Sequence, residues 1–173
     1  MNIEYEATFP NINKTEIRKK LKKAGAKLVR PEFLQKRVSF DLPKGFNHAR
    51  HWVRVRDEGD KITMSYKTTP SKGDGKIEEQ KEVCLEIDDF DKGVELLKSI
   101  QCHQKGYQET KRELWTLDNV EICIDEWPYL EPFLEVEADT EQEVKQACQK
   151  LGLDYSKAKF CAVGQLYKEK YNW

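Results

Sequence analysis

Two pairs of carboxylates stand near the opposite ends of this chain. Glu4 and Glu6 are two positions apart close to the N-terminus, and Glu135 and Glu137 repeat that spacing near the C-terminus. Residues two apart on a β-strand share one face of it. Carboxylate oxygens are the ligands that Mg²⁺ and Mn²⁺ prefer. Each pair could therefore offer ligands to a divalent cation, provided that both segments are strands.

Basic residues follow the same spacing in the middle of the chain. Arg54 and Arg56 share one face of residues 52–57, and Lys67 lies on the polar face of residues 61–67. Guanidinium and ammonium groups are typical partners of phosphate oxygens. A cavity that holds both signs would suit metal-assisted phosphoryl transfer, because a metal and the cations neutralise charge on the transferring group.

The candidate set extends to charged residues on the polar faces of other predicted strands. Its carboxylates are Glu4, Glu6, Glu82, Asp125, Glu135 and Glu137, and its cations are Arg37, Arg54, Arg56, Lys67 and Arg112. Charges of mixed sign tolerate crowding inside a protein when they pair or bind ions. Each motif is common by chance in strands, so a solvated sheet face is the alternative interpretation.

Composition and charge exclude several other classes of protein. The 173 residues hold 30 Lys and Arg against 31 Asp and Glu, whereas a protein that coats nucleic acid would be basic. No apolar run approaches the roughly 18–20 residues of a membrane helix, and the acidic N-terminus is unlike a signal peptide. The five cysteines are scattered without a C-x-x-C pair. We expect a cytoplasmic protein with reduced cysteines and neither nucleic-acid nor membrane partners.

Hydrophobic alternation and capping residues predict the elements that position the charges. Helices should follow the N-cap residues Asn13, Asp89 and Thr140, and the first should end at Gly25. Residues 43–51 and 68–76 should form loops, residues 58–60 a hairpin turn, and residues 156–173 a partly helical tail. Strands are predicted at residues 2–9, 27–42, 52–57, 61–67, 78–87, 103–117, 120–127 and 133–138.

The order of these elements repeats: a strand, a helix and three strands, and then the same again. Residues 36–42 (KRVSFDL) and 111–117 (KRELWTL) are similar and occupy the same place in the two halves. Amphipathic helices must bury their apolar faces, and the apolar strand faces are the available partners. The sequence therefore predicts one α+β domain over residues 1–173. This domain would be a closed eight-stranded antiparallel barrel of two βαβββ halves, with helices outside and charges in the lumen.

The chain resembles the CYTH domains, also called triphosphate tunnel metalloenzymes, which include class IV adenylyl cyclases and thiamine, inorganic and RNA triphosphatases. The resemblance implies a closed tunnel that binds a triphosphate through basic residues and one or two divalent cations through acidic ones. It rests on Glu4-x-Glu6, Trp52-x-Arg54-x-Arg56, Ser65-Tyr66-Lys67, Glu82, Lys111-Arg112, Asp125-Glu126 and the run Leu130 to Glu137 (LEPFLEVE).

The resemblance also implies a role for each matching residue. Thr8 stands where the family has a lysine, and Thr110 stands where a second basic residue is common on the sixth strand. Two cations of the expected lumen are therefore missing. Glu4, Glu6 and Glu82 are the predicted catalytic acids, Glu135, Glu137 and Asp125 are the predicted ligands of Mg²⁺ or Mn²⁺, and Arg37, Arg54, Arg56, Lys67 and Arg112 are the predicted substrate ligands.

Three functions remain open from the sequence. The first is metal-dependent hydrolysis of a small triphosphate, such as tripolyphosphate, thiamine triphosphate or a nucleoside triphosphate. The second is cyclisation of ATP with loss of pyrophosphate, for which no adenine pocket can be named. The third is a binding module for polyphosphate or another phosphorylated ligand, which the two threonines keep open. A homodimer is compatible with each of them.

Overall fold

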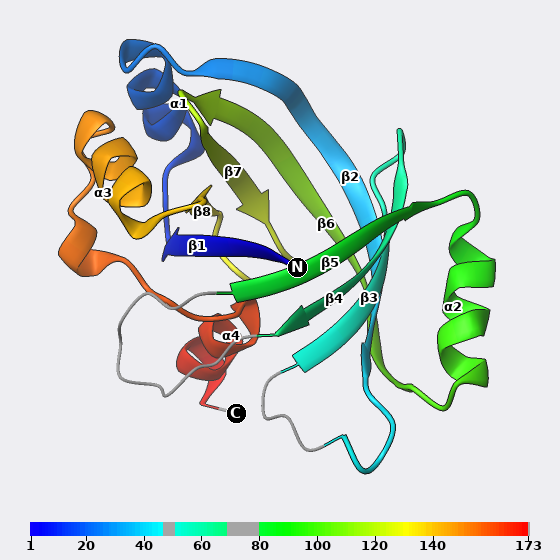
Figure 1. The fold of residues 1–173 in the computed structure, drawn as a ribbon. Helices are drawn as coiled ribbons and strands as arrows, with labels where there is room; N and C mark the ends of the chain where they lie inside the picture. The colour runs from blue at the N-terminus through cyan, green and yellow to red at the C-terminus, as the bar shows by residue number, and fades with distance from the viewer. Residues whose placement is uncertain (47–50, 69–79, 173) are drawn as a thin grey trace.

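The structure is a computed structural model that describes residues 1–46, 51–68 and 80–172 (Figure 1). Residues 47–50, 69–79 and 173 lie outside the described part, and they include all but the first residue of the predicted loop at 68–76 and the start of the predicted strand at 78–87. The helices are α1 (Lys14–Lys23), α2 (Phe90–Ser99), α3 (Glu141–Lys150), the short 3₁₀ helix η1 (Tyr155–Lys157) and α4 (Val163–Tyr171). The strands are β1 (Asn2–Phe9), β2 (Lys27–Asp41), β3 (His51–Asp57), β4 (Ile62–Thr68), β5 (Gln80–Ile87), β6 (His103–Leu117), β7 (Val120–Glu126) and β8 (Phe133–Ala138).

The strands close into a barrel in the order β1-β5-β4-β3-β2-β6-β7-β8, and all neighbours are antiparallel. The predicted α+β class and the closed eight-stranded barrel are therefore confirmed. The long strand β2 is irregular near Pro31, where its register against β6 shifts between Arg30 and Phe33. Proline cannot donate to the ladder, which explains the bend that the sequence predicts there.

The two halves interleave rather than stand side by side. The strand β1 lies between β5 and β8, so the first strand of one half closes the barrel against the last strand of the other. The register has the same symmetry, because Lys36 faces Glu109 while Leu34 faces Lys111. Exchanging each strand with its counterpart four strands later leaves the order around the barrel unchanged, as a duplicated unit should.

Two apolar cores hold α1, α2 and α3 on the outside of the barrel. In the larger core, Ile17 and Leu21 of α1 and Val144 of α3 pack with Ile122 of β7 and Val136 of β8. Each predicted N-cap is confirmed, since the side chains of Asn13, Asp89 and Thr140 accept hydrogen bonds from the backbone N–H three residues later.

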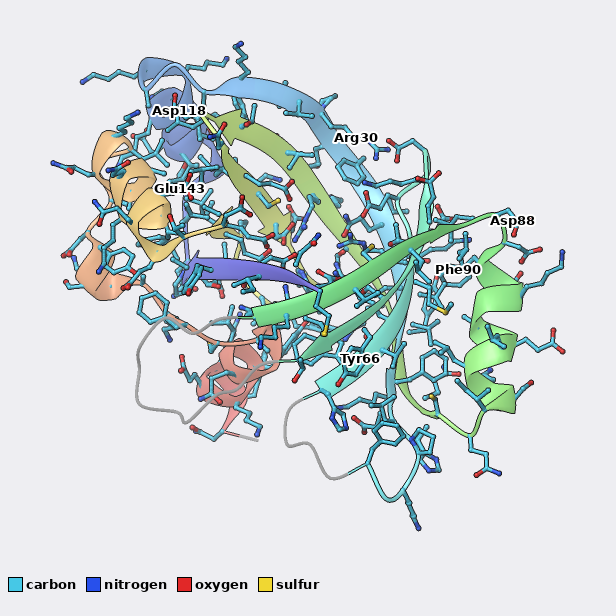
Figure 2. All side chains as sticks on the ribbon, in the orientation of Figure 1. Arg30, Tyr66, Asp88, Phe90, Asp118 and Glu143 are labelled. Atoms are coloured by element: carbon cyan, nitrogen blue, oxygen red, sulfur yellow. The ribbon has the colours of Figure 1, made fainter. Side chains whose placement is uncertain are left out.

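The smaller core lies beneath α2. Phe90 and Leu97 pack with Phe40 of β2 and Val55 of β3. Figure 2 labels Phe90, the first residue of α2. Gly93 permits this close packing, because a Cβ atom there would lie 2.6 Å from Ile87 Cδ1. Since the helices cover the apolar faces, the polar faces of the same strands turn into the barrel.

The C-terminal segment covers another part of the barrel, and it is partly helical as predicted. Leu166 of α4 packs with Trp127 and Phe133, and Thr8 exchanges backbone hydrogen bonds of 2.9 and 2.8 Å with Lys159. Phe133 is the first residue of β8, so α4 packs at the start of that strand. None of the described helices has the length and apolar character that crossing a membrane requires.

Candidate functional site

The predicted site residues all lie on the inner face of the barrel. Arg37, for example, alternates with Lys36 and Val38 along β2, and Val38 belongs to the core beneath α2. Arg54, Arg56, Lys67, Glu82, Glu135 and Asp125 have side chains that are at most 15% exposed. These faces are therefore buried rather than solvated. Cations gather on β2, β3 and β4, and carboxylates gather on β1, β7 and β8.

Lys67 joins the two groups. Its Nζ lies 3.0 Å from Glu4 Oε2, 3.7 Å from Glu6 Oε2 and 4.0 Å from Glu82 Oε2. Burial by itself lowers the pKa of Lys67, but the carboxylates of Glu6, Glu137 and Glu4 outweigh it, and the pKa is raised. Lys67 therefore stays charged among the acids.

The partners of Glu82 are cations, although the sequence predicts that it acts together with Glu4 and Glu6. Arg54 Nη2 lies 3.2 Å from Glu82 Oε1, and Arg54 Nε donates to Ser65 Oγ at 3.1 Å. Burial raises the pKa of Glu82, but Arg54 and Lys67 outweigh it, so the pKa is lowered. An ionised Glu82 fits the role of an orienting counter-ion better than that of a proton acceptor.

Arg56 is held by a carboxylate that sequence reasoning missed. Glu58 Oε1 lies 2.6 Å from Arg56 Nη2, and only 7% of Glu58 is exposed. Glu58 belongs to the predicted hairpin turn, which is confirmed by a 2.9 Å bond from Glu58 N to Lys61 O. Burial, followed by Arg54 and Arg112, lowers the pKa of Arg56 to about 10. A turn residue gives no sequence signal that its side chain folds back into the barrel.

Arg37 lies in a cluster of neutral groups. Its Nη2 donates to Gln35 Oε1 at 2.9 Å and to Thr110 Oγ1 at 3.2 Å, and its guanidinium lies 4.4 Å from the centre of the Trp127 ring. No carboxylate among the described residues pairs with it at 4.0 Å or less. Burial, followed by the charges of Arg54, Arg112 and Arg56, lowers the pKa of Arg37.

Several buried N–H groups near the cations have no acceptor within the described structure. They are Nε2 of Gln35, Nε of Arg37, Nε of Arg56 and Nε1 of Trp127. A buried donor without a partner costs roughly 1–3 kcal/mol, so water or a ligand that accepts hydrogen bonds should satisfy these groups. Gln35 and Trp127 were missed by sequence reasoning. Gln35 could have been found, because it lies two positions before Arg37 and so shares its strand face.

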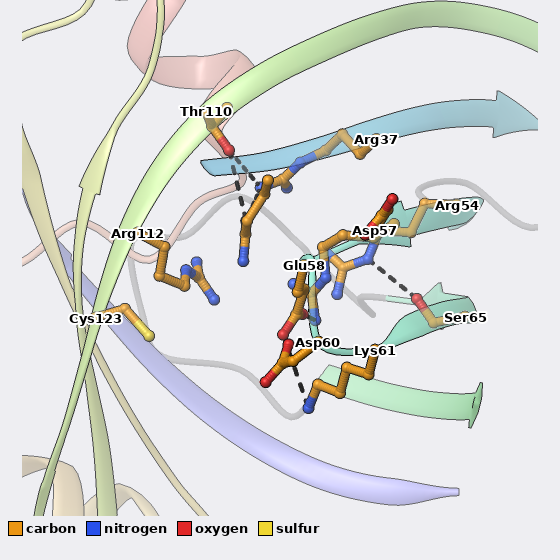
Figure 3. A network of polar contacts seen from close by, with 12 residues as sticks. Arg37, Arg54, Asp57, Glu58, Asp60, Lys61, Ser65, Thr110, Arg112 and Cys123 are labelled. Carbon is orange, nitrogen blue, oxygen red and sulfur yellow. Dashed lines mark hydrogen bonds and ion pairs between the residues drawn. The ribbon is translucent and has the colours of Figure 1, made fainter. Parts of the chain in front are cut away.

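Arg112 is bound to two of the predicted metal ligands. Its Nε donates to Asp125 Oδ1 and its Nη2 to Glu135 Oε2, both at 2.7 Å, and Nη2 also contacts Asp125 Oδ2. The pKa of Arg112 is raised because these carboxylates outweigh burial. Figure 3 shows Arg37, Arg54 and Arg112 reaching from different strands toward the inside of the barrel. Arg112 was predicted to bind phosphate, whereas here its partners are the acids.

Two of the predicted metal ligands, Glu135 and Glu137, have pKa values raised above the ordinary value of a glutamate. Burial, with Glu6 and Glu4 adding to it against Lys67, raises the pKa of Glu137 to about 8. Burial also raises the pKa of Glu135, and Glu6 and Asp125 add to that effect.

A hard divalent cation fits this donor set, because every donor is a carboxylate oxygen and bound positive charge would relieve the repulsion. Across residues 1–46, 51–68 and 80–172, however, no three His, Cys, Asp or Glu side chains are grouped closely enough to hold a metal. Arg112 and Lys67 bridge the acids instead.

The two threonines that replace expected cations are both buried. Thr8 is 2% exposed, and its Oγ1 lies 3.5 Å from Glu6 Oε1. The backbone of Lys159 is hydrogen-bonded to the backbone of Thr8, but the amino group of Lys159 pairs with Glu169 on α4. Thr110 contacts Arg37 and Gln35. In neither place does a neighbouring lysine in the described residues replace the missing charge.

A closed antiparallel barrel with facing groups of buried cations and carboxylates defines the class of this protein. The family model of the CYTH domain matches residues 2–162, so the chain belongs to the CYTH family. A search of curated proteins gave no match.

Solved structures share the fold at low identity. The PH1012 protein of Pyrococcus horikoshii has a TM-score of 0.76 and 24% identity, with 92% of this chain and 96% of that one covered. A candidate adenylate cyclase from Vibrio parahaemolyticus has a TM-score of 0.80 and 11% identity, with 96% and 98% covered. HpAC1 from Hippeastrum, a candidate adenylyl cyclase described as having a dominant triphosphatase activity, has a TM-score of 0.66 and 17% identity, with 98% and 96% covered.

Proposed function

We propose that this protein binds a small linear triphosphate inside its barrel and hydrolyses it with the help of Mg²⁺ or Mn²⁺. The observation that carries the proposal is the unsatisfied hydrogen bonding of the cationic side. Arg37 and Arg56 each have a buried Nε without an acceptor, as do Gln35 Nε2 and Trp127 Nε1. Phosphate oxygens are acceptors only, and they would satisfy these donors while balancing the guanidinium charges.

The residues of the barrel would divide the work of the reaction. Arg54, Arg56 and Lys67 would orient the phosphate chain, and Arg37 would balance its charge from deeper in the neutral cluster. A divalent cation held by Glu135, Glu137 and Asp125 would neutralise charge on the phosphoryl group. Burial raises the pKa of Glu4, against the charge of Lys67, so this carboxylate is suited to take a proton from the attacking water.

The relatives support hydrolysis and cyclisation unequally. HpAC1 is described as having a dominant triphosphatase activity although it is also a candidate cyclase. A cyclase needs a pocket for adenine beside the phosphates. A cavity of about 500 Å³ is lined by Pro10, Asn11, Leu130, Glu131, Lys159, Leu166, Glu169 and Lys170. These residues belong to α4 and its neighbours rather than to the charged lumen, so this cavity is not an adenine pocket beside the phosphates. The dominant triphosphatase activity described for HpAC1 is the observation that favours hydrolysis.

The proposal is tested by incubating the protein with tripolyphosphate, thiamine triphosphate and ATP, each with Mg²⁺ or Mn²⁺. Phosphate, pyrophosphate and cyclic AMP are measured. We expect phosphate release that EDTA abolishes and that Arg54→Met reduces by about a hundredfold or more, since charge-stabilising contacts act in the transition state. Arg18→Met is the matched control, because the Arg18–Glu113 pair at 2.6 Å lies outside the lumen. Cyclic AMP with pyrophosphate would contradict hydrolysis, and metal-dependent binding without turnover would favour the binding module.

A further inference from the structure

Arg112 and a divalent cation would compete for the same oxygen atoms. The guanidinium of Arg112 contacts both carboxylate oxygens of Asp125 and Oε2 of Glu135, which are predicted metal ligands. A metal ion needs oxygen lone pairs at about 2.0–2.6 Å, and the Arg112 guanidinium both occupies lone pairs of these three oxygens and places a positive charge beside them. A metal that binds Asp125 together with Glu135 Oε2 therefore requires Arg112 to move.

The equivalent residue of the other half shows where a moved guanidinium could lie. Arg37 and Arg112 occupy the same position in the repeated segments 36–42 and 111–117. In the register of the barrel, Arg37 faces Arg56, whereas Arg112 faces Asp125. Arg37 consequently has neutral partners and an Nε without an acceptor, while Arg112 is held by acids.

A displaced Arg112 would be unfavourable without an anion. The cationic side already contains Arg37, Arg54 and Arg56, and their charges act on one another and on Arg112. Adding a further guanidinium that has lost its carboxylates increases this repulsion. A phosphate chain in the lumen would remove the penalty by accepting hydrogen bonds from the displaced group.

We propose that Arg112 is an internal counter-cation that a divalent metal displaces from Asp125 and Glu135 toward the phosphate chain. The displaced guanidinium couples the two ligands, because the metal releases it and the phosphate stabilises it after release. Coupling of this kind is reciprocal, so each ligand should tighten the binding of the other by the same factor. This inference rests on the proposed function, and it assigns Arg112 a positioning role beyond direct phosphate contact.

The test measures Mn²⁺ binding by electron paramagnetic resonance, with and without an imido-linked tripolyphosphate analogue that resists hydrolysis, and corrects for chelation by the analogue. In the wild type, we expect the analogue to tighten Mn²⁺ binding by about tenfold or more. Arg112→Met should bind Mn²⁺ alone about tenfold more tightly than the wild type, and the coupling factor should fall to about threefold or less.

Two further variants keep the result interpretable. Arg112→Gln carries the same expectation and retains an amide that can donate to Asp125, so it replaces the Met variant if that variant does not fold. Arg54→Gln is the matched control, because it removes a cation paired with Glu82 rather than with the metal ligands. It should weaken analogue binding and leave the affinity for Mn²⁺ alone within about twofold, as expected for independent sites.

The outcomes separate this inference from the proposed function. If the wild type binds Mn²⁺ and the analogue but neither Arg112 variant binds Mn²⁺ more tightly, Arg112 is a fixed ion pair and the inference is overturned. If the wild type binds neither ligand, the proposed function fails and the inference fails with it. If Mn²⁺ alone binds more tightly to both variants and the coupling persists, the exchange of cations stands but the delivery of Arg112 to phosphate is wrong.

Discussion

The ammonium group of Lys67 on β4 reaches past β5 to lie 3.0 Å from the carboxylate of Glu4 on β1. This pair links the cationic and acidic sides of the lumen, and Glu6 and Glu82 complete its surroundings. The charge of Lys67 therefore offsets the repulsion within an acidic cluster that has few other cations. Removing this charge should lower the stability of the ligand-free protein and should also weaken ligand binding.

We expect Lys67→Met to destabilise the metal-free protein by about 3 kcal/mol at pH 8, because it leaves buried carboxylates without their counter-ion. The loss should shrink near pH 5, because Glu4 and Glu137 have raised pKa values and are more protonated there than at pH 8. Urea unfolding at the two pH values measures both quantities. Lys150→Met removes an exposed ion pair with Asp118 and should change stability by less than about 0.5 kcal/mol. Equal losses at both pH values would contradict this explanation.

The raised pKa of Glu137 predicts how stability depends on pH. Its pKa in the folded protein is about 8 against an ordinary value of 4.5. Between these values the folded protein retains a proton that the unfolded chain has lost, so the contribution to stability falls as pH rises from about 5 to 8.

Glu137→Gln tests that dependence, because it removes the titrating group. With EDTA present, the wild type should melt at a lower temperature at pH 8 than at pH 6, and the variant should show a smaller difference. Mn²⁺ should stabilise the wild type more at pH 8 than at pH 6, since metal ligands must be deprotonated. A melting temperature that rises toward pH 8 in EDTA would refute the assignment.

Glu58 competes with the ligand for Arg56, since it lies 2.6 Å from the guanidinium. We expect Glu58→Gln to tighten binding of the tripolyphosphate analogue by about tenfold. The variant lacks the charged contact between Glu58 and Arg56, so the Arg56 guanidinium can make its charge-assisted hydrogen bonds to the phosphate instead. The same change should cost roughly 1–3 kcal/mol of stability in the free protein. Isothermal titration calorimetry and urea unfolding measure the two effects. Weaker binding in the variant would instead indicate that Glu58 positions Arg56 for its ligand.

Thr8→Lys restores the cation that the family resemblance predicts. The new ammonium group would lie beside Glu6, which Thr8 already contacts, and next to Glu135, its partner in the β1–β8 register. We expect tighter binding of the tripolyphosphate analogue by about tenfold, as an added charged contact should provide. Thr15→Lys, at an exposed position of α1 on the outside of the barrel, is the control. An unchanged affinity and rate would mean that the departure at Thr8 has little effect.

Local structure could be predicted closely from the sequence, because period-two alternation and capping residues are local signals. Strands 103–117 and 133–138 have the predicted bounds, and the charged residues named from alternation do lie inside the barrel. The pairing of strands was harder to predict, because nothing in the sequence near Glu6 indicates that Glu137 will face it on the neighbouring strand. The side-chain contacts of Glu58 and Arg112 also depend on closure of the barrel, which brings distant residues within reach.

The position of β1 between β5 and β8 has a consequence for the folding pathway. The acidic pair Glu4 and Glu6 meets Glu135 and Glu137 only when the first and last strands of the barrel join. Pairing of segments so distant in sequence carries a large loop-closure cost, and such topologies fold slowly. The ladder that assembles the most repulsive part of the lumen is thus a late step in folding. A divalent cation present during refolding should speed that step as well as stabilise its product.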